Sequence, residues 1–155
     1  MLVESEQEAL FVACEMESNA VQLYERAMRV MEQQGRAGEP LYRQLSFMHS
    51  DELEHLRQFR SLYTGLDAPI EQRLALSAIA EGVLFEGGLM GAARRGLFND
   101  VDAMLRFAIQ AEAASAQKYR EFAAVAVNKG ARAALLMIAA EEDKHLSELE
   151  GQASM

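Results

Sequence analysis

Two segments of the sequence carry a Glu-x-x-His pattern at positions where the helical periodicity around them calls for apolar residues. The pairs are Glu52 with His55 and Glu142 with His145. The apolar seams around them recur at steps of three and four: Leu41, Leu45, Met48, Phe59 and Leu62 in the first segment, and Ala131, Leu135, Ile138 and Leu149 in the second. Helical residues three apart project to one side. Both pairs are therefore expected to reach into the interior of a helical bundle, where a metal ion is the expected occupant.

The positions of glycine and proline divide the chain into four long predicted helices. Only two prolines occur in 155 residues, half of which are hydrophobic, and this favours an all-α fold. The expected helices cover about residues 4–34, 40–64, 99–128 and 131–150. Gly35 and Gly130 separate the members of each terminal pair, which predicts two antiparallel hairpins. The segment 66–98 is longer than a tight turn needs, and residues 74–85 are expected to form a short helix within it. The prediction is one domain, 1–155, in which a four-helix bundle is made of two hairpins joined by a long crossover.

The first and third predicted helices each place a Glu and a Tyr on their apolar face. These residues are Glu17 with Tyr24, and Glu112 with Tyr119. The faces are defined by Leu10, Cys14, Val21, Met28 and Met31 in one helix, and by Phe98, Leu105, Ile109, Ala116, Ala123 and Ala126 in the other. The pattern indicates a two-helix repeat, in which each copy supplies one Glu from its first helix and Glu-x-x-His from its second. The tyrosines are interpreted either as core aromatics or as hydrogen-bond donors to the Glu carboxylates.

Four inward carboxylates require compensation on energetic grounds. An unpaired buried ion costs several kcal/mol, whereas a domain is stable by only about 5–15 kcal/mol in total. Two cations would remove this cost. Carboxylate and imidazole ligands suit iron or manganese, with zinc as a further candidate, and the single cysteine argues against thiolate sites and iron–sulfur clusters.

The order of these motifs resembles that of a known family. The elements that carry the resemblance are Glu17-Ser18-x-Ala20 with Tyr24, Glu52-x-x-His55, Glu112 with Tyr119, and Glu142-x-x-His145. In this order the chain resembles a rubrerythrin-type member of the ferritin-like di-iron carboxylate superfamily, over all four predicted helices. The resemblance implies the following ligand roles: Glu17 and Glu112 as terminal ligands, Glu52 and Glu142 as bridges between two ions, and His55 and His145 as ligands of one ion each.

Two features depart from the usual rubrerythrin pattern. Rubrerythrins usually carry a rubredoxin module with two Cys-x-x-Cys pairs, and this chain reaches Met155 without one. The expected electron donor is therefore a separate protein such as a rubredoxin. Many rubrerythrins also have an additional Glu one turn after the third-helix ligand, where this chain has Ser115. The resemblance therefore does not extend to the ligand exchange associated with fast peroxide reduction.

The resemblance implies a protein with two iron ions that reacts with hydrogen peroxide or oxygen as an oxidoreductase. One alternative is a ferroxidase or an iron storage or transfer protein, and another is a metal-stabilised binding module without turnover. A hollow assembled shell would favour storage, whereas a small oligomer with reductant-dependent turnover would favour an enzyme. A homo-oligomer, dimer or larger, is expected in either case.

Charge and segment lengths narrow the partners and the location. The formal charge of −9 argues against nucleic acid as a partner. The apolar run 133–140 is too short to span a bilayer, and the first residues do not resemble a signal peptide. The lone Cys14 cannot form an intrachain disulfide, which fits a reducing compartment. A cytoplasmic protein without a membrane partner is expected.

Overall fold

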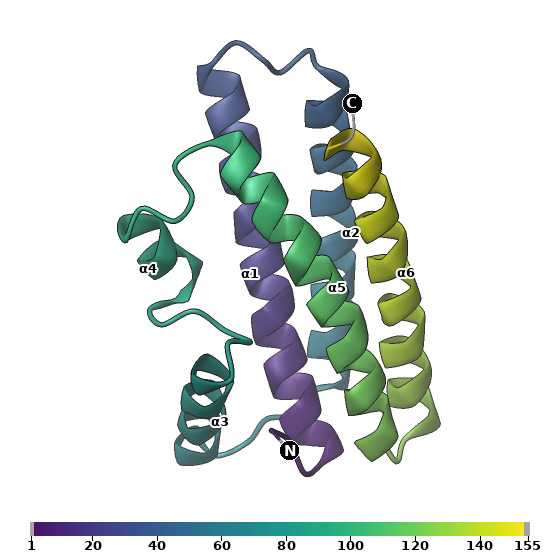
Figure 1. Ribbon diagram of the computed structural model, residues 1–155. Coiled ribbons are helices and arrows are strands. Elements are labelled where there is room, and N and C mark those ends of the chain that lie inside the picture. The colour runs from purple at the N-terminus through teal and green to yellow at the C-terminus, as the bar shows by residue number, and fades with distance from the viewer. Residues whose placement is uncertain (1, 154–155) are drawn as a thin grey trace.

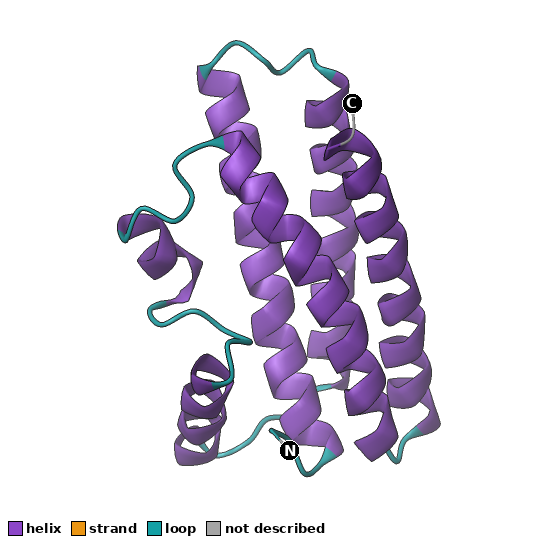
Figure 2. Cartoon of the chain, viewed as in Figure 1, coloured by secondary structure: helices purple, strands orange, loops and turns teal. Residues whose placement is uncertain are grey.

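The structure of the protein is a computed structural model. The chain is all-α over the residues that this structure describes. Within residues 2–153 it contains six helices and no strand (Figure 2). The helices are α1 Glu6–Gln33, α2 Pro40–Leu62, α3 Ala68–Ala80, α4 Gly88–Arg94, α5 Val101–Val125 and α6 Lys129–Ala153. The all-α prediction is therefore confirmed. Within the same range, no helix is both long enough and apolar enough to cross a membrane.

The four long helices lie side by side as two antiparallel hairpins. Helices α1 and α2 form one hairpin and α5 and α6 the other, and Figure 1 shows α2 and α5 running in the same direction. The hairpins meet through contacts of α1 with α5 and of α2 with α6. Every neighbouring pair in this bundle is consequently antiparallel. This arrangement requires a long connection between α2 and α5, because the end of α2 and the start of α5 lie at opposite ends of the bundle.

Polar caps at the helix ends explain where the long helices begin. The Ser5 hydroxyl accepts a hydrogen bond from the backbone N–H of Glu8, so α1 begins at Glu6. The Asp100 carboxylate accepts a hydrogen bond from the backbone N–H of Ala103, so α5 begins at Val101. In the turn between α5 and α6, Asn128 Oδ1 accepts a hydrogen bond from the backbone N–H of Gly130 at 2.7 Å. Helix α6 therefore begins about two residues before the predicted position.

The connection between the hairpins contains two helices where the sequence predicted one short helix at 74–85. Helix α3 starts earlier, because Pro69 stands in its first turn, where the missing N–H costs nothing. It ends at Ala80, because Gly82 follows with φ of +76°, a left-handed conformation that favours glycine. Gly87, with φ of +74°, then precedes α4. Both α3 and α4 contact α1, so the crossover covers the outer side of that helix (Figure 1).

A polar layer divides the core of the bundle into two apolar clusters. The cluster nearer the N-terminal end of α1, called the lower cluster, includes Leu10 and Leu135. The cluster nearer the C-terminal end of α1, called the upper cluster, includes Met31 and Leu45. On each long helix, the residues of the lower cluster lie on one side of the motif along the chain and those of the upper cluster on the other side. The charged side chains between them are thereby held in a water-poor environment by packing on both sides.

Candidate metal centre

The six residues singled out in the sequence meet in the polar layer. One comes from α1, two from α2, one from α5 and two from α6, and each is at most 3% exposed: Glu17, Glu52, His55, Glu112, Glu142 and His145. No other charged side chain is buried among the residues whose burial the structure describes. The helical periodicity therefore identified the complete set of buried charged groups in this part of the chain.

The six side chains fall into two overlapping groups that could each hold a metal ion. The groups are Glu17, Glu52, His55 and Glu142, and Glu52, Glu112, Glu142 and His145. Within each group, one ligand atom per residue lies within 4.8 Å of all the others. Glu52 and Glu142 belong to both groups. Because these two residues occupy equivalent places in the two-helix repeat, the groups are related by exchange of the hairpins.

The inner polar atoms of the cluster lack hydrogen-bond partners. These atoms are Glu17 Oε2, both Oε atoms of Glu52, His55 Nδ1, Glu112 Oε2, Glu142 Oε1 and His145 Nδ1. His55 Nδ1 lies 3.1 Å from Glu142 Oε1, but the two atoms are not aligned as a hydrogen bond. An unsatisfied buried polar atom costs about 1–3 kcal/mol, and buried polar groups are normally paired. Convergent oxygen and imidazole donors without partners therefore fit divalent metal ions, which would satisfy all of them together.

Each histidine is oriented by an acidic residue from the opposite hairpin. The Nε2–H of His145 donates to Asp51 Oδ2 at 2.9 Å, and that of His55 donates to the Glu141 carboxylate. These contacts hold each ring with Nδ1 facing the cluster, where it can bind a metal ion in place of a proton. Asp51 and Glu141 each immediately precede the Glu of a Glu-x-x-His pair. This shared acidic position was a signal that the sequence interpretation missed.

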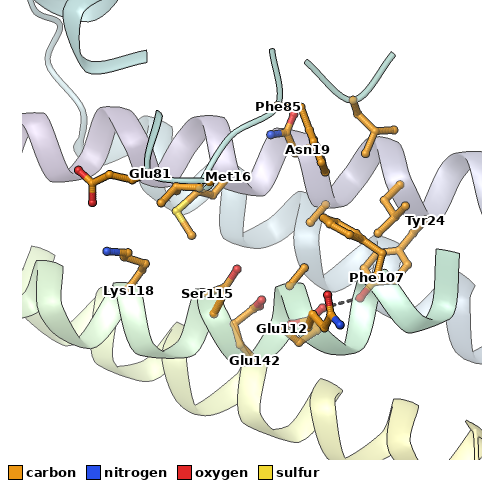
Figure 3. A pocket seen from close by; sticks show the side chains of 18 residues that line it. Met16, Asn19, Tyr24, Glu81, Phe85, Phe107, Glu112, Ser115, Lys118 and Glu142 are labelled. Atoms are coloured by element: carbon orange, nitrogen blue, oxygen red, sulfur yellow. Dashed lines mark hydrogen bonds between the residues drawn. The ribbon is translucent and has the colours of Figure 1, made fainter. Parts of the chain in front are cut away.

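The tyrosines also link the hairpins. Tyr24 of α1 donates to Glu112 Oε1 of α5 at 2.5 Å, and Tyr119 of α5 donates to Glu17 Oε1 of α1 at 2.9 Å. Figure 3 shows the first of these bonds. Both hydroxyls are buried, and burial together with the nearby carboxylates raises the pKa of each tyrosine well above its usual value. Each tyrosine therefore remains a donor, and it occupies one oxygen of its Glu while the other oxygen faces the cluster.

The charges of the cluster depend strongly on one another. Burial raises the pKa of the Glu17 and Glu142 carboxyls, and the nearby Glu52 charge raises it further. Burial also favours the neutral form of Glu52, but the imidazoles of His145 and His55, whose Nδ1 atoms lie 3.2 and 3.4 Å from Glu52 Oε1, outweigh this and lower its pKa. For His55 and His145, burial lowers the pKa, but the adjacent carboxylates outweigh it and raise the pKa to about 11. In the ion-free protein, imidazolium protons thus supply the positive charge that metal ions would otherwise bring.

Two further residues with possible ligand atoms, His49 and Cys14, lie outside this cluster. His49 hydrogen-bonds Glu25 Oε1 at 2.9 Å near the surface. Cys14 is partly buried against the lower apolar cluster, and burial raises its pKa to about 11, so the thiol behaves as a small apolar group. Neither residue belongs to the two candidate ligand groups.

Comparison with known proteins adds no family assignment. The chain matches no family model, no curated protein and no solved structure in these searches. The chemistry of the centre is therefore inferred from the arrangement of its own residues.

The outer carboxylates provide a direct test of how the histidines are held. Asp51→Asn and Glu141→Gln are each expected to lower metal affinity about 10–100-fold, because a neutral amide no longer stabilises the ring orientation that presents Nδ1. Isothermal titration with Zn²⁺ measures the effect. Asp143→Asn is the matched control, because this exposed α6 carboxylate pairs with Arg120 and contacts neither histidine. Equal affinities in all three variants would contradict this role of the carboxylates.

Proposed function

We propose that the protein is a ferritin-like di-iron carboxylate protein with redox activity toward hydrogen peroxide or oxygen. The observation that carries the proposal is the convergence of unpaired oxygen and nitrogen atoms from six buried residues on four helices. The overlap of the two candidate groups at Glu52 and Glu142 supports two adjacent ions rather than one. Four carboxylates carry the charge that two divalent ions balance, which removes the cost of burying them unpaired.

Each proposed ion has its own terminal ligands. Glu17 and His55 would hold one ion, and Glu112 and His145 the other, while Glu52 and Glu142 would contact both. This donor set suits iron or manganese, and zinc is also compatible. Iron is proposed because two adjacent ferrous ions can together supply the two electrons that convert hydrogen peroxide and two protons into two waters.

The surrounding side chains suit a centre that exchanges protons for metal ions and holds its ligands in fixed directions. In the ion-free protein, burial and the nearby Glu52 charge raise the pKa of Glu142, so metal ions that bind this carboxylate would take the place of a proton. Tyr24 and Tyr119 keep their protons in hydrogen bonds with Glu112 and Glu17 and so fix the direction of these two carboxylates. Apolar clusters above and below limit the access of water. These residues would orient the ligands and limit water at the centre while the ions supply electrons.

Repeated turnover requires electrons from outside this chain. The sequence contains one cysteine, whereas a rubredoxin-type site needs four thiolates. We therefore propose that a separate electron-donor protein, such as a rubredoxin, reduces the oxidised centre after each turnover. We also propose that the protein is a homo-oligomer located in the cytoplasm.

Anaerobic stopped-flow spectroscopy tests this function. Protein loaded with two ferrous ions per chain is expected to be oxidised once by hydrogen peroxide or oxygen and to cycle only after a donor protein is added. His55→Ala is expected to slow this oxidation, because it removes a ligand of one ion, whereas the surface variant His49→Gln should not. If both metals remain bound but neither oxidant reacts within minutes, the redox proposal fails. Ferric mineral inside a large assembly would instead support iron storage.

A further inference from the structure

A cavity of about 300 Å³ lies beside the candidate metal centre. It is enclosed by α1, α5 and the segment 81–89 of the crossover, and its inner end is formed by Glu112 and Glu142. Figure 3 shows these two carboxylates on one side of the space and crossover residues on another. The crossover thus does more than connect the hairpins, because it forms one wall of a space that reaches two proposed metal ligands.

The cavity walls are mainly apolar, and their arrangement is fixed by packing. The large apolar residues that line the space are Met16, Leu23, Val83, Phe85, Leu89 and Phe107. Phe85 of the crossover packs against Phe107 of α5, with ring centroids 5.1 Å apart. Ala20 and Ala111 also line the walls, together with Ser115, and these small side chains leave the volume open. A site of this kind, largely apolar with a few polar groups, is typical of small-molecule binding.

The size of the cavity exceeds what the proposed oxidants need. One water occupies about 30 Å³ of liquid volume, so the cavity corresponds to roughly ten waters. Hydrogen peroxide and oxygen each contain only two heavy atoms. A volume at the lower end of the range for organic ligands, about 300–1,000 Å³, therefore fits a small organic molecule better than it fits either oxidant alone.

The charges around the cavity favour a neutral occupant. Lys118 is the one cationic side chain among its lining residues, and its ammonium already lies 3.2 Å from the Glu121 carboxylate. Glu81 also lines the cavity, and its inner end presents the carboxyl groups of Glu112 and Glu142 rather than a cation. A charged molecule would additionally lose hydration against apolar walls. The neutral polar side chains that line the cavity include Ser115 and Gln110 from α5 and Asn19 from α1, and Figure 3 labels Ser115 and Asn19.

We propose that this cavity binds a small neutral organic molecule that is apolar over most of its surface and carries one hydroxyl or carbonyl group. Its apolar part would contact the Phe85 and Phe107 rings, and its polar group would hydrogen-bond with Ser115 or Asn19. The inference deepens the proposed function in one respect, because the molecule would bind next to the metal ligands Glu112 and Glu142. Binding to the cavity itself does not require that metal be present.

Methionine-methyl NMR tests the proposal with defined probes. Protein carrying ¹³C-methyl methionine is titrated with 4-methylphenol or 4-methylbenzoate, both ion-free and after loading with Zn²⁺. The neutral phenol is expected to shift the Met16 signal in a saturable way and to bind at least about tenfold more tightly than the benzoate, because the anion loses hydration and meets carboxylates. Met137, exposed on α6, is the reference signal that should not move. Tighter binding of the benzoate, or no shift of Met16, would overturn the proposal.

A pair of variants on α5 tests the location. Ser115→Phe places a ring in the cavity and is expected to weaken 4-methylphenol binding at least about tenfold by occlusion. Ala113→Phe adds the same ring at an exposed position that does not line the cavity and should leave the affinity unchanged. Ala20→Leu fills the cavity from α1 and serves the same purpose if Ser115→Phe does not fold. Equal affinity in the filled and control variants would overturn the assignment.

Elemental analysis of the same samples separates this proposal from the metal proposal. Two zinc ions per chain without a Met16 response would overturn the cavity site while the metal centre stands. A Met16 response that Ser115→Phe abolishes, in protein that binds no zinc, would support the cavity site and overturn the metal centre.

Discussion

Glu52→Ala is expected to abolish binding of both metal ions, whereas His55→Ala should remove mainly one. The reason is that Glu52 belongs to both candidate ligand groups, while His55 belongs to one. Glu142→Ala should behave like Glu52→Ala, because Glu142 is the second residue that the groups share. Elemental analysis of protein reconstituted with excess ferrous ion under anaerobic conditions measures the number of bound ions.

The control for this experiment lies on the same helix. Glu54→Ala removes an exposed α2 carboxylate that pairs with Arg57, so it should retain the metal content of the unmodified protein. Circular dichroism establishes that each variant is helical before metal content is compared. The two-ion arrangement is wrong if Glu52→Ala and His55→Ala lose the same number of ions, or if the unmodified protein binds only one.

Removal of metal should lower the melting temperature by roughly 10 °C or more. A ligand at about 1,000 times its Kd stabilises the folded state by about 4 kcal/mol, and each kcal/mol shifts the melting temperature of a 150-residue protein by about 2–4 °C. In addition, the ion-free protein keeps mutually repelling carboxylates in a buried layer. Differential scanning calorimetry of loaded and chelator-treated protein measures the difference. Identical melting temperatures would mean that the cluster does not bind metal in the folded state.

Deleting charge from the cluster should partly restore the thermal stability of the ion-free protein. Glu17→Gln combined with Glu112→Gln keeps the shape of both side chains but removes two buried carboxylates. The ion-free double variant is therefore expected to melt above the ion-free unmodified protein and to gain less from added metal. Glu32→Gln combined with Glu86→Gln, two exposed substitutions, controls for the loss of two negative charges. A double variant that melts no higher than this control would show that carboxylate repulsion is not what destabilises the ion-free state.

Local helix geometry explains why much of the centre was predictable from sequence. A helix places residues three, four and seven positions apart on one side, so polar residues on an apolar seam must point toward the core whatever the helix packs against. Glu52 with His55 satisfied this condition, and the repeat located Glu142 and His145 independently. The all-α fold and the two hairpins followed from the same periodicity and from glycine positions. The start of α2 agreed with the prediction, and the starts of α1, α5 and α6 each differed by two residues, because side-chain caps such as Ser5 set the first helical turn.

The relative placement of the hairpins, in contrast, was decided by the tertiary structure. The bonds from Tyr24 to Glu112 and from His145 to Asp51 join residues 88 and 94 positions apart, and no local periodicity specifies such pairs. The path of the crossover depends on glycine conformations and on burial against α1, so its two helices and the cavity beneath segment 81–89 were not evident from the sequence. The sequence by itself determined which side chains face inward, because that property belongs to a single helix. Only the packing of four helices and a crossover decided which of those side chains meet, because that property depends on contacts between distant parts of the chain.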